Sequence, residues 1–419
     1  MTELRDDCFE LDGNDLTPLS DALALLAERL SSIVETETVP LSKALNRALA
    51  EDVTAPRNVP PHNNAAVDGY AVYFDDLNSD EETRLNITGR IAAGHPLGRP
   101  ARAGEALRIF TGAPVPEGPE TIFMQEDCVL EGDVVVLKPG IKKGANYRFA
   151  GEDVKKGSVI LTQGTRLRPQ EIGLAASVGR SELKVFKPLR VAVFSTGDEV
   201  RDPSGAAPDG CIFDANRYTV MGLLNDMGTV VTDLGILPDQ LGDIQNALEK
   251  AATSHDLLIT SGGVSLGEED HVKDAVQALG EIQFWRLAIK PGRPIAMGKV
   301  GTTAFIGLPG NPVASMVTFM RIARPIVLLL GGHKSIAPSL FQVRAGFDFK
   351  KKQGRREWVR ARLERGQDGI LSAIKHPQGG AGVLTSMVES DGLIELAEDQ
   401  GPFEEGFMVD FLPFSEVTR

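Results

Sequence analysis

The segment VFSTGDE (193–199) is an apolar run that ends in a turn carrying glycine and two acids. Two further segments, LLITSGGVS (257–265) and AFIGLPGNP (304–312), also consist of an apolar run followed by a glycine-bearing turn. Apolar runs this short, separated by helical patterns, predict buried strands of an α/β sheet. Because open α/β sheets bind ligands at the carboxyl ends of their strands, the three turns predict one shared pocket. Its backbone amides, hydroxyls and carboxylates suit an anionic ligand accompanied by a metal.

Strand and helix patterns alternate around these turns, which predicts βαβ units and a mainly parallel sheet. The stretch 282–297, interrupted by Lys290-Pro291-Gly292, predicts an antiparallel pair attached to that sheet. The expected strands cover 189–194, 229–234, 257–260 and 304–306, and the expected helices cover 215–227, 240–253, 271–279 and 312–330.

The chain has 419 residues, which is too many for one ordinary core, so two to four domains are expected. Helical patterns near 20–33 and 41–50 come first. Proline, glycine and short alternating stretches then predict a small β-rich domain that ends near residue 150. Alternation over 338–419 predicts a small antiparallel sheet or barrel.

The net charge is −14, from 44 Lys and Arg against 58 Asp and Glu, and it argues against a general nucleic-acid binder. Three scattered cysteines form no CxxC pair and no disulfide framework, which fits a reducing compartment. The acidic N-terminus has no signal-peptide pattern, and no apolar run has the length of a membrane span. We therefore expect a cytoplasmic protein with no membrane and no nucleic-acid partner.

The acids beside the glycine turns each allow two interpretations. Gly262 and Gly263 let backbone amides approach an anion closely. Asp270 stands where the next helix begins, so it is either an N-terminal cap or a metal-binding or catalytic acid. Glu199 is either a solvated loop acid or, with the acid before it, part of a Mg²⁺ site. The spacing of Asp239 favours a helix cap.

In the turn 290–294, two prolines restrict the backbone beside two cations. Arg293 can bind an oxyanion through two hydrogen bonds, although an exposed basic hairpin tip has the same pattern. Asp68 and Thr111, each before a glycine, have plain turns as their default interpretation, and the Thr111 hydroxyl can also reach a ligand. The histidines lack metal-ligand spacing and no nucleophile elbow or Walker loop occurs, so covalent catalysis is not indicated.

Six motifs in this order resemble those of the MoeA-type molybdopterin molybdenumtransferases, a family that includes the gephyrin E domain and its plant counterpart. The resemblance runs from about residue 15 to the end of the chain. It is carried by Asp68-Gly69-Tyr70-Ala71, Phe110-Thr111-Gly112-Ala113-Pro114, Ser195-Thr196-Gly197-Asp198-Glu199, the 260–270 loop, Lys290-Pro291-Gly292-Arg293-Pro294 and Leu308-Pro309-Gly310-Asn311-Pro312.

The resemblance implies a multidomain α/β plus β fold and an elongated homodimer with four domains in each subunit. The central domain, 189–332, would be the MogA/MoaB-like molybdopterin-binding α/β domain that the adenylating partner enzyme shares. A β-rich domain at 52–151 would divide the helical dimerisation domain into 15–51 and 152–188. A small β-barrel-like domain would follow at 338–419.

The family reaction inserts molybdenum from molybdate into adenylylated molybdopterin and releases AMP, and it depends on a divalent cation such as Mg²⁺. The implied partners are a second copy of the chain, the molybdopterin adenylyltransferase, and apo-molybdoenzymes or their chaperones. Tungstate and molybdate have nearly the same size and charge, so the sequence does not separate them.

Residue by residue, the resemblance implies catalytic roles for Asp68, Thr111, Glu199, Asp239 and Asp270, with Glu199 and Asp270 as Mg²⁺ ligands. The site would be composite, with Asp68 and Thr111 from one subunit and the α/β loops from the other. The implied substrate-binding residues are Arg148, Asp153, Ser195, Thr196, Gly197, Ser261, Gly262, Gly263, Ser265, Arg286, Lys290, Arg293, Pro309, Gly310, Asn311 and Pro312.

Two positions depart from the family pattern. Arg286 stands where a lysine is often found, and these residues are not interchangeable at a shaped anion site. Val67 replaces a common methionine. Two other functions fit the same α/β domain: a molybdopterin-binding scaffold or carrier without turnover, and a nucleotide pyrophosphatase. The long β insert and the 262–265 loop argue against the pyrophosphatase.

Overall fold

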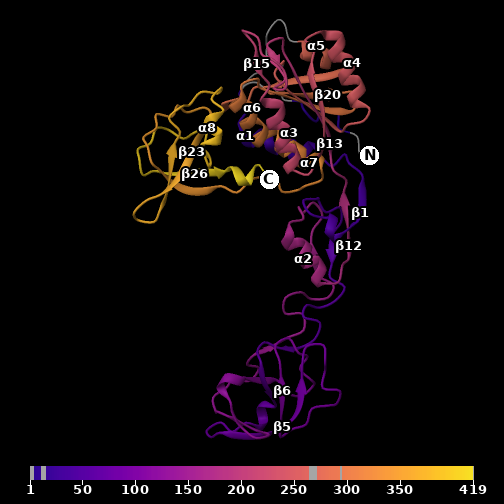
Figure 1. The fold of residues 1–419 in the computed structure, drawn as a ribbon, viewed down its shortest axis with the longest axis vertical. Helices are drawn as coiled ribbons and strands as arrows, with labels where there is room; N and C mark the ends of the chain where they lie inside the picture. The colour runs from indigo at the N-terminus through magenta and orange to yellow at the C-terminus, as the bar shows by residue number, and fades with distance from the viewer. Residues whose placement is uncertain (1–3, 11–15, 264–270, 293–294, 419) are drawn as a thin grey trace. The chain divides into compact units, whose positions relative to one another are not determined.

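The computed structural model describes residues 4–10, 16–263, 271–292 and 295–418. The chain forms two compact units (Figure 1). The larger unit comprises Met1–Glu51, Gln163–Leu167 and Lys184–Arg419, and the smaller unit comprises Asp52–Thr162 and Arg168–Leu183.

The larger unit is built around a six-stranded sheet. In spatial order its strands are β16 (Val230–Leu237), β13 (Arg190–Thr196), β17 (Leu257–Ser261), β21 (Thr303–Leu308), β20 (Ile295–Val300) and β18 (Gly280–Trp285). The first four strands are parallel, and β20 runs antiparallel to both of its neighbours. The predictions of a mainly parallel sheet and of an attached antiparallel pair are confirmed.

Helices cover both faces of this sheet. The helices α4 (Leu241–Ala252) and α5 (His271–Leu279) lie together over one face (Figure 1). The other face packs against α3 (Asn216–Asp226), α1 (Leu19–Arg29) and the helical stretch 312–330. Successive residues of a strand point to opposite faces, so the middle of β13, residues 191–194, carries apolar side chains toward both faces.

The helical stretch 312–330 consists of α6 (Pro312–Thr318), a π-helical turn (Phe319–Ala323) and α7 (Arg324–Leu330). Its length and composition are sufficient for a membrane span. However, 94% of its most apolar window is buried inside the protein, which is the behaviour of a core helix.

The helix expected over 41–50 is wrong. Only Leu41–Lys43 forms a short 3-10 turn, and Asn46 has a φ of 63°, which no helix continues. Ala48 and Leu49 instead form β-bridges with residues far along the chain, Arg166 and Val185. Pairing with segments that are distant in the chain cannot be predicted from a local sequence pattern.

The end of the chain forms a closed five-stranded barrel, which confirms the predicted barrel-like domain. Neighbouring strands in the barrel are β23 (Arg356–Arg365), β24 (Leu371–Lys375), β22 (Phe341–Ala345), β26 (Met408–Pro413) and β25 (Gly392–Leu396), and β25 pairs back to β23. The pair β22–β24 is parallel, so the barrel is not wholly antiparallel. The short strand β19 (Ile289–Lys290) extends this sheet from the α/β region.

A buried carboxylate joins the barrel to the α/β domain. Glu395, on β25, lies 3.0 Å from Arg321 of the π-helical turn and also pairs with Arg356. The indole of Trp358 donates a third interaction at 2.9 Å. The side chains of Glu395 and Arg321 are only 3% and 7% exposed. Burial lowers the pKa of Arg321, so its charge depends on this partner.

The smaller unit contains a six-stranded sheet of β7 (Thr121–Met124), β4 (Gly69–Val72), β6 (Glu105–Ile109), β5 (Thr83–Ile91), β9 (Val134–Leu137) and β8 (Val129–Glu131). It also contains α2 (Pro169–Ser177) and the strand pairs β3 (Asn64–Ala65) with β10 (Tyr147–Arg148), and β2 (Val53–Thr54) with β11 (Val159–Leu161). The β-rich prediction for this region is confirmed.

The plain-turn interpretation of Asp68-Gly69 is wrong, because Gly69 is the first residue of strand β4. A Cβ atom at Gly69 would lie 1.7 Å from the carbonyl oxygen of Phe123. Glycine is therefore required by the close approach of two backbones rather than by a turn.

We predict that Glu395→Gln destabilises the larger unit by about 3–5 kcal/mol, because it leaves the buried Arg321 without a counter-charge, while Arg356 keeps its pair with Glu398. Both tryptophans of the chain, Trp285 and Trp358, lie in this unit, so the urea midpoint of their fluorescence measures the effect. Glu364→Gln, at the exposed Arg362–Glu364 pair, is the matched control and should cost at most about 1 kcal/mol. Equal shifts for the two variants would contradict this role for Glu395.

A pH dependence is expected in the smaller unit. Arg99 binds the buried Glu105 carboxylate through two hydrogen bonds of 2.8 and 2.9 Å and lowers its pKa from 4.5 to about 2. A depressed folded-state pKa stabilises the fold above pH 4.5, and this contribution is lost as the pH falls toward 2. The shift corresponds to about 3 kcal/mol.

Hydrogen exchange of peptides from β5 and β6 should therefore show Glu105→Gln less protected than the unmodified protein at pH 7, with the difference shrinking toward pH 2. Glu131→Gln removes an exposed pair with Arg84 in the same unit and should leave protection unchanged. A difference that is constant with pH would show that the charge of Glu105 is not responsible.

Candidate functional site

The strand order creates a pocket where the sheet changes direction. From β13 the chain runs through α3 to β16 on one side, and then through α4 to β17 on the other side. The loops after β13 and β17 therefore diverge, and open α/β sheets bind ligands at such a point. A pocket of about 310 Å³, the three-loop pocket, lies there.

Ten predicted site residues line this pocket, nine from the three loops and Asp239 from the loop after β16. They are Ser195, Thr196, Gly197, Glu199, Asp239, Ser261, Gly262, Gly263, Gly310 and Pro312. The prediction that the three turns converge on one pocket is confirmed. Asp239 does not cap the next helix, since α4 begins after Gln240.

Two glycines allow the loop after β17 to pass close to its neighbours. Gly262 and Gly263 have φ values of 91° and 64°, a conformation that other residues rarely adopt. A Cβ atom at Gly263 would lie 2.7 Å from the Thr196 side chain and 2.8 Å from that of Val272. The pocket wall at this point is therefore backbone, which can approach a ligand closely.

Asn216 ties two of the loops together. Its side-chain amide donates to the Ser261 hydroxyl at 2.8 Å and to the Gly310 carbonyl at 2.7 Å. The Ser261 hydroxyl in turn donates to the Pro309 carbonyl at 3.1 Å. This network fixes the loop after β17 relative to the loop after β21.

Three carboxylates line the three-loop pocket, and they differ in how they are engaged. Asp214 accepts hydrogen bonds of 3.1 and 3.0 Å from the backbone and guanidinium of Arg217, and both side chains are buried. Asp239 accepts one of 3.3 Å from the Thr196 hydroxyl. Among the described residues, Glu199 has no hydrogen-bond or ion-pair partner for its carboxylate. Glu199 is therefore the acid that is available to a ligand.

Within the described ranges, no three His, Cys, Asp or Glu side chains are close enough together to hold a metal ion. Glu199 and Asp239 nevertheless both line the three-loop pocket. Mg²⁺ commonly takes one or two carboxylates and completes its coordination with substrate phosphate oxygens and water. The described donors thus fit a Mg²⁺ ion that arrives with a phosphate-bearing substrate.

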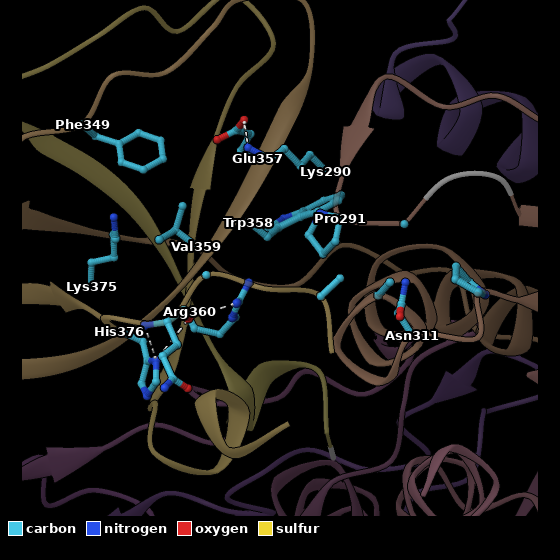
Figure 2. Close-up of a pocket in the computed structure, with 16 residues that line it drawn as sticks. Lys290, Pro291, Asn311, Phe349, Glu357, Trp358, Val359, Arg360, Lys375 and His376 are labelled. Carbon is cyan, nitrogen blue, oxygen red and sulfur yellow. Dashed lines mark hydrogen bonds and ion pairs between the residues drawn. The ribbon is translucent and has the colours of Figure 1, made fainter. Parts of the chain in front are cut away.

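A second pocket, the barrel pocket, has a volume of about 440 Å³ and lies between the α/β domain and the barrel of the larger unit. Figure 2 shows Lys290, Pro291 and Asn311 on the α/β side of it. The barrel side carries Phe349, Glu357, Trp358, Val359, Arg360, Lys375 and His376.

The barrel pocket is rich in cations. Arg360 is 5% exposed and binds the Ser386 hydroxyl and two backbone carbonyls, with no carboxylate among the described residues. Burial lowers the pKa of Arg360. Lys290 pairs with Glu357 at 2.9 Å, and Lys375 lies over the ring of Phe349. A buried guanidinium without a counter-charge suits an anionic ligand.

Residues of the turn after β21 line both pockets. Pro309 and Asn311 line the barrel pocket, whereas Gly310 and Pro312 line the three-loop pocket. Asn311 precedes α6 but makes no capping hydrogen bond with its side chain. Its amide is therefore directed to the pocket rather than used by the helix.

The smaller unit brings together Asp68 and Thr111. The backbone amide and hydroxyl of Thr111 both donate to one oxygen of Asp68 at 2.7 Å. These bonds lower the pKa of Asp68, so the partly exposed carboxylate stays ionised. Arg148, also exposed, lies 3.9 Å from Glu152. Asp153 is exposed and binds the Val59 carbonyl only through its backbone amide.

Of four other predicted residues, three lie outside the residues that the structure describes and one lies outside both pockets. Ser265, Asp270 and Arg293 lie outside the described residues. Arg286 is exposed after β18, and it is absent from the described lining of the two pockets.

The sequence did not identify two of the pocket residues with the strongest contacts. Asn216 and Arg360 acquire their roles from partners that are distant in the chain. An asparagine at the first turn of a predicted helix, two residues after an acid, is a signal for Asn216. Arg360 alternates with apolar residues on a strand and gives no such signal.

Sequence models of three families match most of the chain. The "MoeA N-terminal region (domain I and II)" matches residues 17–179. The "Probable molybdopterin binding domain" matches residues 192–328, and the "MoeA C-terminal region (domain IV)" matches residues 342–414. The second of these contains the three loops.

Individual relatives match nearly end to end. The molybdopterin molybdenumtransferase of Haemophilus influenzae is 38% identical over 95% of this chain and 99% of its own length. The Nostoc protein of that name is 33% identical over 88% and 87%. The crystal structure of the molybdopterin biosynthesis moeA protein from Pyrococcus horikoshii OT3 has a TM-score of 0.80 and 29% identity, covering 95% of this chain and 100% of its own.

We predict that Asn216→Ala loosens the three-loop pocket without unfolding the domain. Loss of two side-chain hydrogen bonds should raise amide exchange at residues 261–263 and at Gly310 and Asn311 by about tenfold. Asn225→Ala, at an exposed position of the same helix, is the matched control. Unchanged exchange in both loops would show that Asn216 does not hold them.

Proposed function

The chain belongs to the family of MoeA-type molybdopterin molybdenumtransferases, and we propose that it inserts molybdenum from molybdate into adenylylated molybdopterin with release of AMP. The observation that carries this proposal is the three-loop pocket. Glycine backbone, hydroxyls and an unpaired carboxylate meet there at the switch point of the sheet. These groups suit the phosphoanhydride of the substrate.

Glu199 is the proposed Mg²⁺ ligand. Asp239 is a second described carboxylate that lines the same pocket, and Asp270 is the further ligand that the family resemblance implies. A bound Mg²⁺ would neutralise charge on the phosphoanhydride and on the departing phosphate. The residues themselves contribute placement, since Asn216 and the paired glycines fix the loops on which a phosphate would rest.

The barrel pocket is the proposed place for molybdate and the molybdopterin half of the substrate. The buried Arg360 and the nearby Lys290 supply positive charge for an oxyanion. Its position across the turn 309–312 from the three-loop pocket suits a substrate whose two halves are joined by a pyrophosphate.

We propose further that the protein works as a cytoplasmic homodimer in which Asp68 and Thr111 of one subunit serve the α/β loops of the other. The pre-formed Asp68–Thr111 pair supports this, because a partly exposed, ionised carboxylate held by two hydrogen bonds is ready to act on a neighbour. A molybdopterin adenylyltransferase would supply the substrate, and apo-molybdoenzymes or their chaperones would accept the product.

The test is AMP release from adenylylated molybdopterin, with and without molybdate and Mg²⁺. We expect release to require both ions and the product to reactivate an apo-molybdoenzyme. Glu199→Gln should slow release by about 100-fold or more, because it removes a charge at the reacting phosphates. Glu249→Gln, on the exposed face of α4, should have no effect. Tight binding without turnover would instead support a carrier.

The composite site is tested by mixing two variants in the same assay. Asp68→Ala and Glu199→Gln should each fold, dimerise and be inactive. Dimers re-formed from an equal mixture should recover about a quarter of the activity, because half of them contain one intact site of two. No recovery would place Asp68 and Glu199 in the same subunit's site, and loss of the dimer in Asp68→Ala would assign Asp68 a structural role.

A further inference from the structure

The rim of the three-loop pocket carries two large apolar side chains that the proposed chemistry does not use. Ile212 and Phe213 form the short strand β15, and they are 60% and 51% exposed. Both line the pocket. Scattered exposed apolar residues are ordinary, but two adjacent ones at the edge of a polar pocket suggest contact with an apolar part of its ligand.

The backbone holds this rim strand in register with the acid-bearing loop. β15 pairs in parallel with β14 (Val200–Arg201), which follows Glu199 directly. The Ile212 amide donates to the Glu199 carbonyl at 2.8 Å, and the Asp214 amide donates to the Arg201 carbonyl at 2.9 Å. Phe213 pairs with Arg201, so it has a fixed position two residues along the strand pair from Glu199.

The buried Arg217 holds both β14 and β15 in place. Arg217 binds Asp214, the residue after β15, and Asp202, the residue after β14, at 3.0 and 2.5 Å. It also pairs with Asp233 on β16. Because these contacts hold the carboxyl ends of both strands, the rim is a pre-formed surface rather than a loop that orders on binding.

The Phe213 ring has no aromatic or cationic neighbour among the described residues. Its exposed face is thus free to stack on a planar group, an interaction that is favourable for any nucleobase. The groups around Glu199 suit a phosphate, so a ring attached to that phosphate is the planar group that would reach Phe213.

We infer that the ring of Phe213 is the platform on which a flat heteroaromatic ring of the phosphate-bearing substrate stacks. The inference rests on the proposed function and adds to it a residue that determines ligand specificity. The substrate has two such rings, adenine and pterin, and the same stacking chemistry serves either.

The test is calorimetric binding of AMP, ribose 5-phosphate and free pterin to the full-length protein with Mg²⁺. Phe213→Ala should weaken AMP binding by about tenfold or more, and it should leave ribose 5-phosphate binding within about twofold. Phe213→Tyr should restore AMP binding. Phe341→Ala removes a phenylalanine of the same 51% exposure from the barrel surface and should change nothing.

The pattern of losses separates the two rings. A loss for AMP assigns adenine to the platform, and a loss for pterin alone assigns the pterin. The inference is overturned if Phe213→Ala changes neither, if it weakens ribose 5-phosphate equally, or if it changes the oligomeric mass. It is also overturned if the unmodified protein binds neither AMP nor pterin more tightly than ribose 5-phosphate. Absence of molybdate-dependent AMP release from the unmodified protein would contradict the proposed function but not the stacking.

Discussion

The architecture of the larger unit depends on the buried carboxylate of Glu395. It holds Arg321 from the helical core and Arg356 from the barrel in one ion-pair cluster, and it accepts a hydrogen bond from Trp358. Separating the buried Glu395 and Arg321 would leave each charge without its partner, which is costly, so the barrel has one preferred position on the α/β domain. The walls of the barrel pocket come from both domains, and that pocket exists because this position is fixed.

The three-loop pocket has a different origin. It follows from connectivity, since the chain leaves β13 to one side and returns on the other, which separates the loops above it. Glycines at 262 and 263 then let these loops pass without side chains between them. One pocket is therefore made by topology and backbone, whereas the other is made by side chains at a domain boundary.

Features that depend on residues close together in the sequence were predicted, whereas features that depend on residues far apart in the sequence were not. The helix 271–279 was predicted with its observed bounds, because its apolar periodicity is local. The helix at 41–50 was wrong, because β-bridges from Ala48 and Leu49 to distant segments override local preference. The convergence of the three turns was predicted from strand patterns. The roles of Asn216 and Arg360 were not, since each depends on partners that only the folded chain provides.

The turn 309–312 has one consequence beyond geometry. It is a single stretch of backbone with a face in each pocket, and Asn216 and Ser261 hold it through the carbonyls of Gly310 and Pro309. A ligand that shifts this backbone from one side alters the free energy of binding on the other. Thermodynamic linkage makes this effect reciprocal. The two halves of a substrate that occupies both pockets therefore bind cooperatively.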